Sequence, residues 1–177
     1  MKLVVLDRDG TINHDSDQYI KSPAEWKPIK GSLEAIARLT QAGWRVVVAT
    51  NQSGIACGLF DMAALNAIHD VMHRAVHQAG GRIDAVFFCP HAGDSDCACR
   101  KPRPGMLLEI GKRMNVALEG VPMVGDALRD LQAAAAAGAR PVLVLTGKGK
   151  KTRAAGGLPP GTETFRDLAA FVDRQVP

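Results

Sequence analysis

Aromatic side chains are scarce in this chain of 177 residues, which has five phenylalanines, two tryptophans and one tyrosine. Proteins that bind single-stranded nucleic acid stack the bases on aromatic side chains. So few rings argue against a nucleic-acid partner. The chain also lacks an internal repeat and a Gly-, Ser- or Pro-rich linker between halves, so we expect a single domain over residues 1–177.

Long hydrophobic runs are missing as well. The N-terminal apolar run covers only residues 3–6 before the first acid, whereas a membrane span needs about 20 apolar residues. We therefore expect a cytoplasmic protein with no membrane partner. Charge of one sign does not dominate either, because 22 Lys and Arg against 18 Asp and Glu give a net charge of +4. This mild excess suits an anionic partner without identifying it.

Cysteine is also rare, with four residues in the chain, but three of them lie with a histidine inside eleven residues. In a reducing compartment such a cluster binds metal more often than it forms disulfides. Three thiolates and one imidazole make a closed set, which is typical of a structural tetrahedral zinc site. We expect this zinc loop, residues 89–101, to brace Arg100 and Lys101, because a closed set leaves no open coordination position for water. Its predicted ligands are Cys89, His91, Cys97 and Cys99.

Apolar segments rich in β-branched residues alternate with helical patterns along the chain. Near-continuous apolar runs are typical of strands buried on both faces of a parallel sheet. Their alternation with helices predicts a doubly wound, Rossmann-like α/β sheet with right-handed crossovers. The expected strands are Leu3–Leu6, Val46–Ala49, Ile83–Phe88, Val121–Val124 and Val142–Leu145, and the expected helices are Ser32–Gln41, Met62–Ala79, Gly105–Asn115, Leu128–Ala137 and Phe165–Val172.

Polar motifs follow the predicted strands where they end. Residues 7–11 read Asp-Arg-Asp-Gly-Thr, residues 50–54 read Thr-Asn-Gln-Ser-Gly, and residues 125–126 read Gly-Asp. Ligands of open parallel sheets bind beyond the carboxyl ends of the strands, so these motifs are expected to converge. Several carboxylates at one rim repel one another unless a cation neutralises them, and oxygen ligands suit Mg²⁺. The sequence therefore predicts a magnesium site.

Together these motifs resemble the haloacid dehalogenase superfamily of phosphatases. The segments 50–55, 89–91 and 97–106 resemble more narrowly its histidinol-phosphatase-like branch, and within it the D-glycero-D-manno-heptose 1,7-bisphosphate 7-phosphatases. The resemblance runs from about Lys2 to about Lys148. It implies a haloacid dehalogenase-like fold and a small-molecule sugar bisphosphate substrate. The implied reaction removes the C7 phosphate and leaves heptose 1-phosphate for ADP-heptose and lipopolysaccharide core synthesis.

The resemblance implies four catalytic residues. Asp7 attacks phosphorus and forms an aspartyl phosphate, which divides one difficult displacement into two easier ones. Asp9 protonates the leaving alkoxide and then activates water. Thr50 and Lys101 stabilise charge on the transferring phosphoryl group.

It also implies the residues that hold the ion and the substrate. Mg²⁺ is expected on a carboxylate oxygen of Asp7, the backbone carbonyl of Asp9 and the carboxylate of Asp126. Asp130 is expected to orient a metal-bound water. Arg100 is the expected cation for the remaining C1 phosphate. The full set of predicted substrate-binding residues is Arg8, Asp15, Tyr19, Asn51, Gln52, Ser53 and Arg100.

The spacing of the motifs leaves no room for a cap domain. Roughly forty residues separate Asp7 from Thr50, and one loop and one helix use them. Between Asn51 and Lys101 there is room for a helix, a strand and the zinc loop. We expect an open, capless, monomeric enzyme whose specificity lies in the loops at 13–20, 52–58 and 92–101. The segment 15–19 either reaches over the site or is a plain connecting loop.

Several alternatives stay open at this stage. Histidinol phosphatase shares all the motifs, and a nucleic acid 3′-phosphatase is disfavoured by the scarcity of aromatics. A non-catalytic, zinc-braced binding module is the alternative from another class. His69, His73 and His77 recur every four residues, and we expect them on a solvated helix face rather than on a metal. The basic run 148–153 is either a solvated loop or a contact for a distal phosphate.

Overall fold

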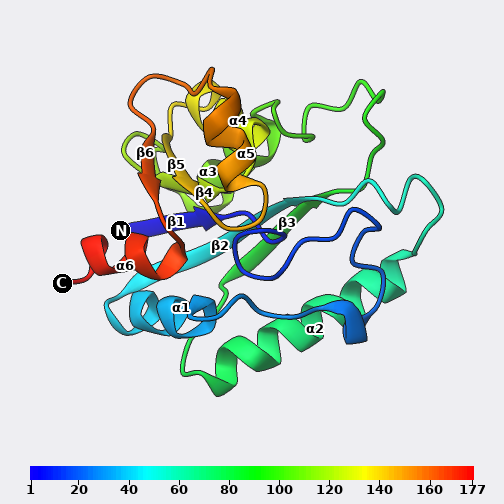
Figure 1. Ribbon diagram of the computed structural model, residues 1–177, viewed down its shortest axis with the longest axis horizontal. Coiled ribbons are helices and arrows are strands. Elements are labelled where there is room, and N and C mark those ends of the chain that lie inside the picture. Colours follow the sequence, from blue (N-terminus) through cyan, green and yellow to red (C-terminus); the bar gives the residue numbers. More distant parts are fainter.

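One parallel sheet of six strands runs through the centre of the chain, which the computed structural model describes over residues 1–177. The strands are β1 (Lys2–Leu6), β2 (Trp44–Asn51), β3 (Ala85–Cys89), β4 (Pro122–Gly125), β5 (Arg140–Val144) and β6 (Glu163–Phe165). Their order is β3-β2-β1-β4-β5-β6, and every neighbouring pair is parallel (Figure 1). This confirms the predicted doubly wound sheet.

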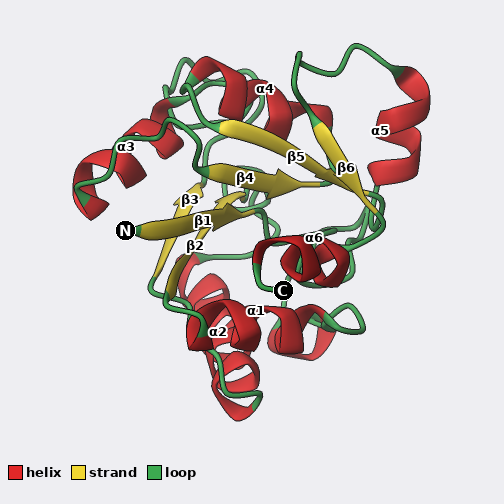
Figure 2. Ribbon diagram, turned by 90° about the vertical axis from the view of Figure 1, so that its left-hand side faces the viewer, coloured by secondary structure: helices red, strands yellow, loops and turns green.

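Helices cover both faces of the sheet (Figure 2). They are α1 (Ser32–Gln41), α2 (Met62–Gln78), α3 (Gly105–Met114), α4 (Leu128–Ala136), α5 (Gly149–Ala155) and α6 (Leu168–Gln175), with a short 3₁₀ turn, η1 (Pro23–Glu25). One face packs against α1, α2 and α6, and the other packs against α3 and α4. None of these helices is long and apolar enough to cross a membrane.

Strands β1 to β4 contribute side chains to two separate apolar cores. In β1, Val4 and Leu6 belong to the core under α1, α2 and α6, whereas Leu3 and Val5 belong to the core under α3 and α4. Successive side chains of a strand point to opposite faces. Burial on both faces therefore explains why the sequence of β1 is continuously apolar and does not alternate.

The structure differs from the predicted elements chiefly in three ways. The third strand begins at Ala85, not Ile83, because the Asp84 side chain accepts from the backbone N–H of Val46 at 2.8 Å, in place of the backbone carbonyl that a longer ladder would supply. Phe165 is the last residue of β6 and pairs with Val144. The final helix begins only at Leu168, after its N-cap Asp167.

The basic run after β5 is the fourth difference. It forms helix α5 and not a loop. Two contacts hold this helix in place, since the backbone N–H of Lys148 donates to Asp126 and the hydroxyl of Thr152 donates to the Asp126 carbonyl, at 2.8 and 2.7 Å. Tertiary contacts therefore override a sequence that has no apolar stripe.

The order of the strands creates a crevice at the carboxyl ends of β1 and β4. From β1 the sheet continues to β2 on one side and to β4 on the other, so the connecting helices diverge at this point. Asp7 follows β1 and Asp126 follows β4. Between Asp7 and α1 there is only a loop with η1, and between β2 and β3 only a loop with α2, so no cap domain covers the crevice.

Candidate active site

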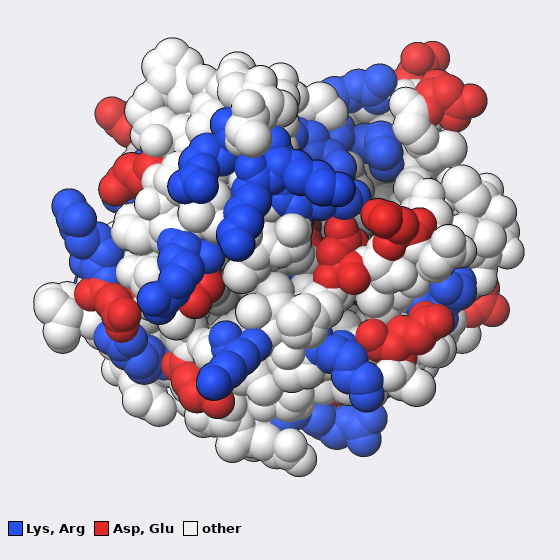
Figure 3. Space-filling model, in the orientation of Figure 1, with Lys and Arg blue, Asp and Glu red and all other residues white.

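The crevice holds a polar cavity of about 220 Å³, and Tyr19 is its one hydrophobic lining residue. Lys and Arg side chains gather over α4 and α5 on the face of the molecule shown in Figure 3. Two of them, Arg129 and Lys148, line the cavity. The predicted site residues that also line it are Asp7, Asp9, Asp15, Tyr19, Thr50, Asn51, Ser53, Arg100 and Lys101.

Asp7 lies at the centre of this cavity and is paired with a buried lysine. The ammonium of Lys101 is 2.9 Å from Asp7 Oδ1 and 2.7 Å from Asp130 Oδ1, and it also donates to the Ala49 carbonyl at 2.8 Å. Lys101 and Asp130 are fully buried. The three charges form one structural unit, because removing the lysine would leave two buried carboxylates without their cation.

Burial and neighbouring charges shift the pKa values of Asp7 and Lys101. Burial and the nearby Asp130 raise the pKa of Asp7 well above its ordinary value, although Lys101 opposes the rise. Burial alone would lower the pKa of Lys101, but the carboxylates of Asp130 and Asp7 raise it. Lys101 is therefore a permanent cation beside Asp7.

Two carboxylate oxygens and one carbonyl at the crevice have no hydrogen-bond partner. Asp7 Oδ1 accepts from Lys101 and Asp126 Oδ2 accepts from the Lys148 N–H, which leaves Asp7 Oδ2 and Asp126 Oδ1 free. The carbonyl of Asp9 accepts no hydrogen bond either. The carboxylate oxygens of Asp7, Asp126 and Asp130 come within 4.8 Å of one another. These free hard oxygens suit Mg²⁺.

The chain makes room for this cluster with glycines. A Cβ atom on Gly10 would lie 2.0 Å from Asp126 Oδ2, and one on Gly147 would lie 2.3 Å from the same atom. Both glycines also have positive φ angles, of 82° and 55°. Burial, together with Asp130, raises the pKa of Asp126 to about 6. A cation bound here would relieve that electrostatic cost.

Asp9 is held next to Asp7 by three donors. Its Oδ1 accepts from the Arg8 guanidinium at 2.9 Å and from the Asn13 amide at 3.0 Å, and its Oδ2 lies 3.5 Å from the Gln52 amide. Burial alone would raise the pKa of Asp9, but these contacts, above all that with Arg8, lower it. Asp9 is thus an oriented carboxylate in the free protein.

Two predicted substrate-binding side chains lie behind the cavity and not in it. Arg8 is fully buried and turns toward Asp9 and α2, because its guanidinium finds an acceptor there. Gln52 is also buried and donates to Thr50 Oγ1 at 2.9 Å. That these two side chains contact substrate stays a prediction, and in this structure neither of them lines the cavity. They support Asp9 and Thr50 instead.

Asp130 and Asn51 have clear structural roles. The two oxygens of Asp130 accept from Lys101 and from the backbone N–H of Ala127 at the start of α4. The amide of Asn51 donates to the Lys101 carbonyl and accepts from the Lys101 N–H, both at 3.1 Å. Asn51 therefore clamps the main chain of Lys101. That Asp130 orients a metal-bound water stays a prediction.

Unpaired cations line the cavity beside this centre. Arg129 makes no hydrogen bond or ion pair within the chain, and Nη1 of Arg100 is buried without a partner. Lys148 reaches across to Asp15, with 3.4 Å between Nζ and Oδ2. Cavity residues that the predicted set omitted are Ser16, Asp17, Arg129 and Lys148. Ser16 and Asp17 lie in the segment 15–19 and Lys148 in the basic run 148–153, and the sequence had marked both segments as candidates for a contact with substrate. Arg129 lies three residues after Asp126.

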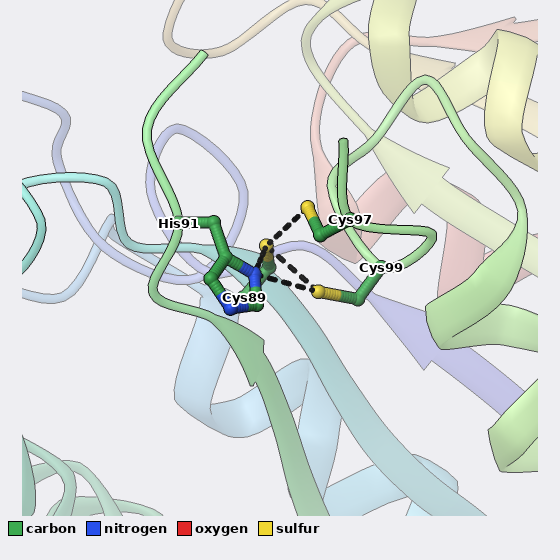
Figure 4. Close-up of side chains that lie close together, drawn as sticks. All are labelled: Cys89, His91, Cys97 and Cys99. Carbon is green, nitrogen blue, oxygen red and sulfur yellow. Dashed lines mark hydrogen bonds between the residues drawn. The ribbon is translucent and has the colours of Figure 1, made fainter. Parts of the chain in front are cut away.

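The four predicted zinc ligands converge at the end of β3 (Figure 4). Cys89 Sγ lies 3.3 Å from His91 Nδ1, 2.9 Å from Cys99 Sγ and 3.7 Å from Cys97 Sγ. Zinc bonds of about 2.3 Å to sulfur and 2.0 Å to nitrogen imply ligand separations of roughly 3.4–3.8 Å in a tetrahedron. The Cys89–Cys97 separation lies in this range, the Cys89–His91 separation is slightly shorter and the Cys89–Cys99 separation is clearly shorter. The four donors are thus gathered closely enough to hold zinc, and their chemistry suits it.

The loop that carries these ligands is braced by a residue that the sequence analysis did not single out. Arg103 donates to the carbonyls of Ser95 and Cys97, the first at 2.8 Å. Arg100 and Lys101 follow Cys99 directly. Arg100 and Lys101 thus connect the cysteine cluster to the carboxylate cluster, because Lys101 pairs with Asp7 and Asp130.

The histidines on α2 are not all solvated as predicted. His73 and His77 are exposed, but His69 is buried, with 8% of its surface accessible. Its Nε2 atom lies 3.1 Å from Nη1 of Arg8. The flank of the helix that carries His69 packs against the loop after β1, which a helical-wheel argument cannot detect.

Comparison with known proteins agrees with this geometry. A protein-family model described as HAD-hydrolase-like matches residues 98–171. The D-glycero-beta-D-manno-heptose-1,7-bisphosphate 7-phosphatase of Bordetella bronchiseptica is 64% identical over 174 residues, which are 98% of this chain and 97% of that protein. The enzyme of the same name from Pseudomonas putida is 54% identical over 171 residues, which are 97% of each.

Two crystal structures are also similar. The D,D-heptose 1,7-bisphosphate phosphatase of B. bronchiseptica, complexed with magnesium and phosphate, matches with a TM-score of 0.98 and 63% identity over 99% of this chain and 98% of that one. The enzyme from Burkholderia thailandensis matches with a TM-score of 0.80 and 58% identity over the same shares. The fold and site define a HAD-type hydrolase. Within that class, the chain belongs to the family of D-glycero-beta-D-manno-heptose-1,7-bisphosphate 7-phosphatases.

Proposed function

We propose that this protein is a magnesium-dependent phosphatase that removes the C7 phosphate of D-glycero-β-D-manno-heptose 1,7-bisphosphate. The observation that carries the proposal is Asp7, which lines a polar cavity beside the buried Lys101, has an oxygen, Oδ2, without a hydrogen bond, and lies with a carboxylate oxygen within 4.8 Å of Asp126. The names of the relatives supply the sugar and its β anomer. The product is heptose 1-phosphate, which would feed ADP-heptose synthesis for the lipopolysaccharide core.

The first step transfers the phosphoryl group to the protein. An oxygen of Asp7 attacks phosphorus while the bond from phosphorus to the C7 oxygen breaks. Asp9, as a carboxylic acid, gives its proton to that oxygen, so the sugar leaves as an alcohol and Asp9 becomes a carboxylate. The negative phosphate beside Asp9 opposes the effect of Arg8 and favours proton uptake before this step.

The second step regenerates Asp7. The Asp9 carboxylate takes a proton from water, whose oxygen attacks phosphorus while the bond to Asp7 breaks, and inorganic phosphate leaves. In this step Asp9 must be ionised in order to accept the proton, and its lowered pKa favours the ionised form. Lys101 and the Thr50 hydroxyl stabilise the charge on the phosphoryl oxygens in both steps.

Asp7, the carbonyl of Asp9 and Asp126 would hold Mg²⁺, since these groups carry the oxygens without hydrogen-bond partners. When bound, the ion supplies positive charge against the phosphoryl oxygens and the cluster of carboxylates. Zinc in the cysteine cluster would have no open coordination position, so its role would be to hold the loop before Arg100 and Lys101.

The phosphate at C1 needs cations of its own. Arg100 and Arg129 fit this role, because neither guanidinium is satisfied by a carboxylate of the chain, and both line the cavity. Ser53 lines the same cavity and its hydroxyl makes no hydrogen bond within the chain, which suits a sugar hydroxyl. The guanidiniums of Arg100 and Arg129 thus favour a substrate that carries a second phosphate.

A panel of phosphate esters tests the proposal. Phosphate release would be measured for the β and α anomers of the heptose bisphosphate and for histidinol phosphate, with Mg²⁺ and with a chelator. We expect the highest kcat/KM for the β anomer and no turnover without Mg²⁺. A preference for histidinol phosphate would assign the chain to the related activity, and release from none of these esters would indicate a binding module.

We further propose that the protein acts as a monomer in the cytoplasm. A reducing compartment keeps the three cysteines of the cluster available for metal. The four predicted catalytic residues, Asp7, Asp9, Thr50 and Lys101, already meet in the cavity of a single chain, so the proposed chemistry needs no residue from a second copy. Size-exclusion chromatography with light scattering measures the oligomeric state, and a stable dimer would contradict this part of the proposal.

A further inference from the structure

A buried chain of three side chains connects helix α2 to Asp9. Nε2 of His69 lies 3.1 Å from Nη1 of Arg8, and Nε of Arg8 lies 2.9 Å from Oδ1 of Asp9. Arg8 is fully buried and His69 is 8% exposed. His69 is separated from the first motif by about sixty residues of sequence, so only the fold brings it here.

The direction of the hydrogen bonds in this chain is fixed by chemistry. The guanidinium of Arg8 can only donate, so Nε2 of His69 must accept. An accepting Nε2 requires the neutral imidazole with its proton on Nδ1. Burial and the positive charge of Arg8 lower the pKa of His69 to about 3, which agrees with a neutral ring.

Arg8 has no other side-chain acceptors. Its Nη2 atom is buried without a partner, so His69 and Asp9 are the two groups that orient the guanidinium. The guanidinium in turn binds Oδ1 of Asp9. Oδ1 accepts from Arg8 and Asn13, whereas Oδ2 has only the longer contact of 3.5 Å with the Gln52 amide, so Oδ2 is the oxygen more available for proton transfer at the cavity.

We propose that His69 is a positioning residue for Asp9. By accepting from Arg8, it fixes the guanidinium against Oδ1, and this presents Oδ2 to the oxygen that leaves the phosphorus. The inference rests on the proposed function, in which the proton of Asp9 passes to that oxygen as the bond from phosphorus to oxygen breaks. Without His69 the guanidinium loses one of its two anchors, and the proton donor is misplaced.

A misplaced proton donor affects substrates unequally. The alkoxide of a sugar is a poor leaving group and needs the proton, whereas p-nitrophenolate leaves readily without it. Loss of positioning should therefore lower kcat/KM for the heptose bisphosphate more than for p-nitrophenyl phosphate. A general disturbance of the fold would lower both values by the same factor.

Variants at His69 provide the test. His69→Gln keeps an acceptor near the place of Nε2, while His69→Asn is too short to reach Arg8 and His69→Leu has no acceptor. For the asparagine and leucine variants we expect kcat/KM to fall about 100-fold with the heptose bisphosphate and about threefold or less with the aryl ester. His69→Gln should stay within about threefold of the wild type for both esters, and so should the matched control His73→Leu, whose side chain is exposed on the same helix.

The outcomes separate the two proposals. Equal losses for both esters, or a glutamine variant as damaged as the asparagine variant, would overturn the positioning role. A wild-type protein that hydrolyses neither ester would overturn the proposed function itself. Nitrogen-15 NMR of the imidazole gives a readout independent of activity, since the inference requires the neutral form of His69 with the proton on Nδ1. A proton on Nε2 would contradict it.

Discussion

The carboxylate cluster and the cysteine cluster lie on either side of Arg100 and Lys101, yet they are held in different ways. Asp7 and Asp126 follow β1 and β4, so the sheet fixes their backbones, and both are buried. The cysteine cluster begins at the end of β3, but its other members lie on a loop and His91 is exposed. One cluster is part of the core and the other is at the surface.

The two clusters also differ in how their charge is balanced. The carboxylates have a built-in counter-ion, because Lys101 pairs with Asp7 and Asp130. The shortest contacts of the thiols join only sulfur and imidazole atoms, and the one cation near them is Arg103, whose Nη1 is 4.0 Å from Cys97 Sγ. The first cluster can therefore persist while its ion exchanges, whereas the second needs an ion to hold its shape. This contrast predicts an exchangeable magnesium and a structural zinc.

The largest effect is expected from Asp7→Asn, which keeps the shape of the side chain but removes the nucleophile. Phosphate release should fall by about 10⁴-fold or more, while the zinc content and the thermal midpoint stay near those of the wild type. Phosphate assays, elemental analysis and circular dichroism measure the three quantities. Full retained activity would exclude the proposed mechanism.

Lys101→Met tests the built-in counter-ion. Asp7 and Asp130 would be left buried without their cation, so the free energy of unfolding should fall by about 3–5 kcal/mol. Urea unfolding in Mg²⁺-free buffer measures it. The double variant with Asp130→Asn removes one of the stranded charges and should recover part of the loss. If the double variant is no more stable than the single one, the three charges do not act as a unit.

Cys99→Ser tests the second cluster. We expect loss of zinc, a fall of the thermal midpoint by about 4 °C and a fall in kcat/KM of about tenfold, because the chain that leads to Arg100 and Lys101 loses its anchor. Cys57→Ser is the matched control, since Cys57 is exposed and lies outside the cluster. Zinc retained by the serine variant, or lost by the control, would refute the assigned ligand set.

The smallest effect is expected from Asp126→Asn, which should raise the free energy of unfolding when no metal is bound. Its pKa is raised to about 6 in the folded protein without metal, so the protonated form stabilises the fold at low pH, and this contribution is lost as the pH rises from about 4 through 6. In chelator at pH 7.5, Asp126→Asn should raise the free energy of unfolding by about 1–3 kcal/mol.

The same variant distinguishes the role of the ion. Near pH 3.5 the stability difference between Asp126→Asn and the wild type should vanish, because Asp126 is then protonated in both states. Added Mg²⁺ should stabilise the wild type but not the variant. A variant that Mg²⁺ stabilises as much as the wild type would show that Asp126 is not a ligand.

The sheet and the centre of the site could be predicted from the sequence for one physical reason. Strands such as β1 are buried on both faces, so their apolar runs are visible locally, and the polar residues that follow them must converge at one edge. Asp7, Lys101 and Asp126 meet as these arguments require. The zinc ligands, close in sequence, were equally accessible.

The errors occurred where a distant partner decides the environment. Arg8 and His69 are buried against each other across about sixty residues, and neither position shows this in its neighbours. Helix α5 depends on contacts with Asp126, and β6 has only three residues that pair with β5. Such elements carry no periodic apolar pattern, so local reasoning could not find them.

The clamp that Asn51 forms on the main chain of Lys101 has a consequence for evolution and engineering. Lys101 is anchored by this clamp and by its buried ion pairs, not by residues 92–96 of the preceding loop. That segment lines no part of the cavity. Its length and composition can therefore change while the catalytic lysine stays in place. An insertion there can grow into a cover over the open cavity, which is a route to new substrate selectivity that leaves the chemical centre intact.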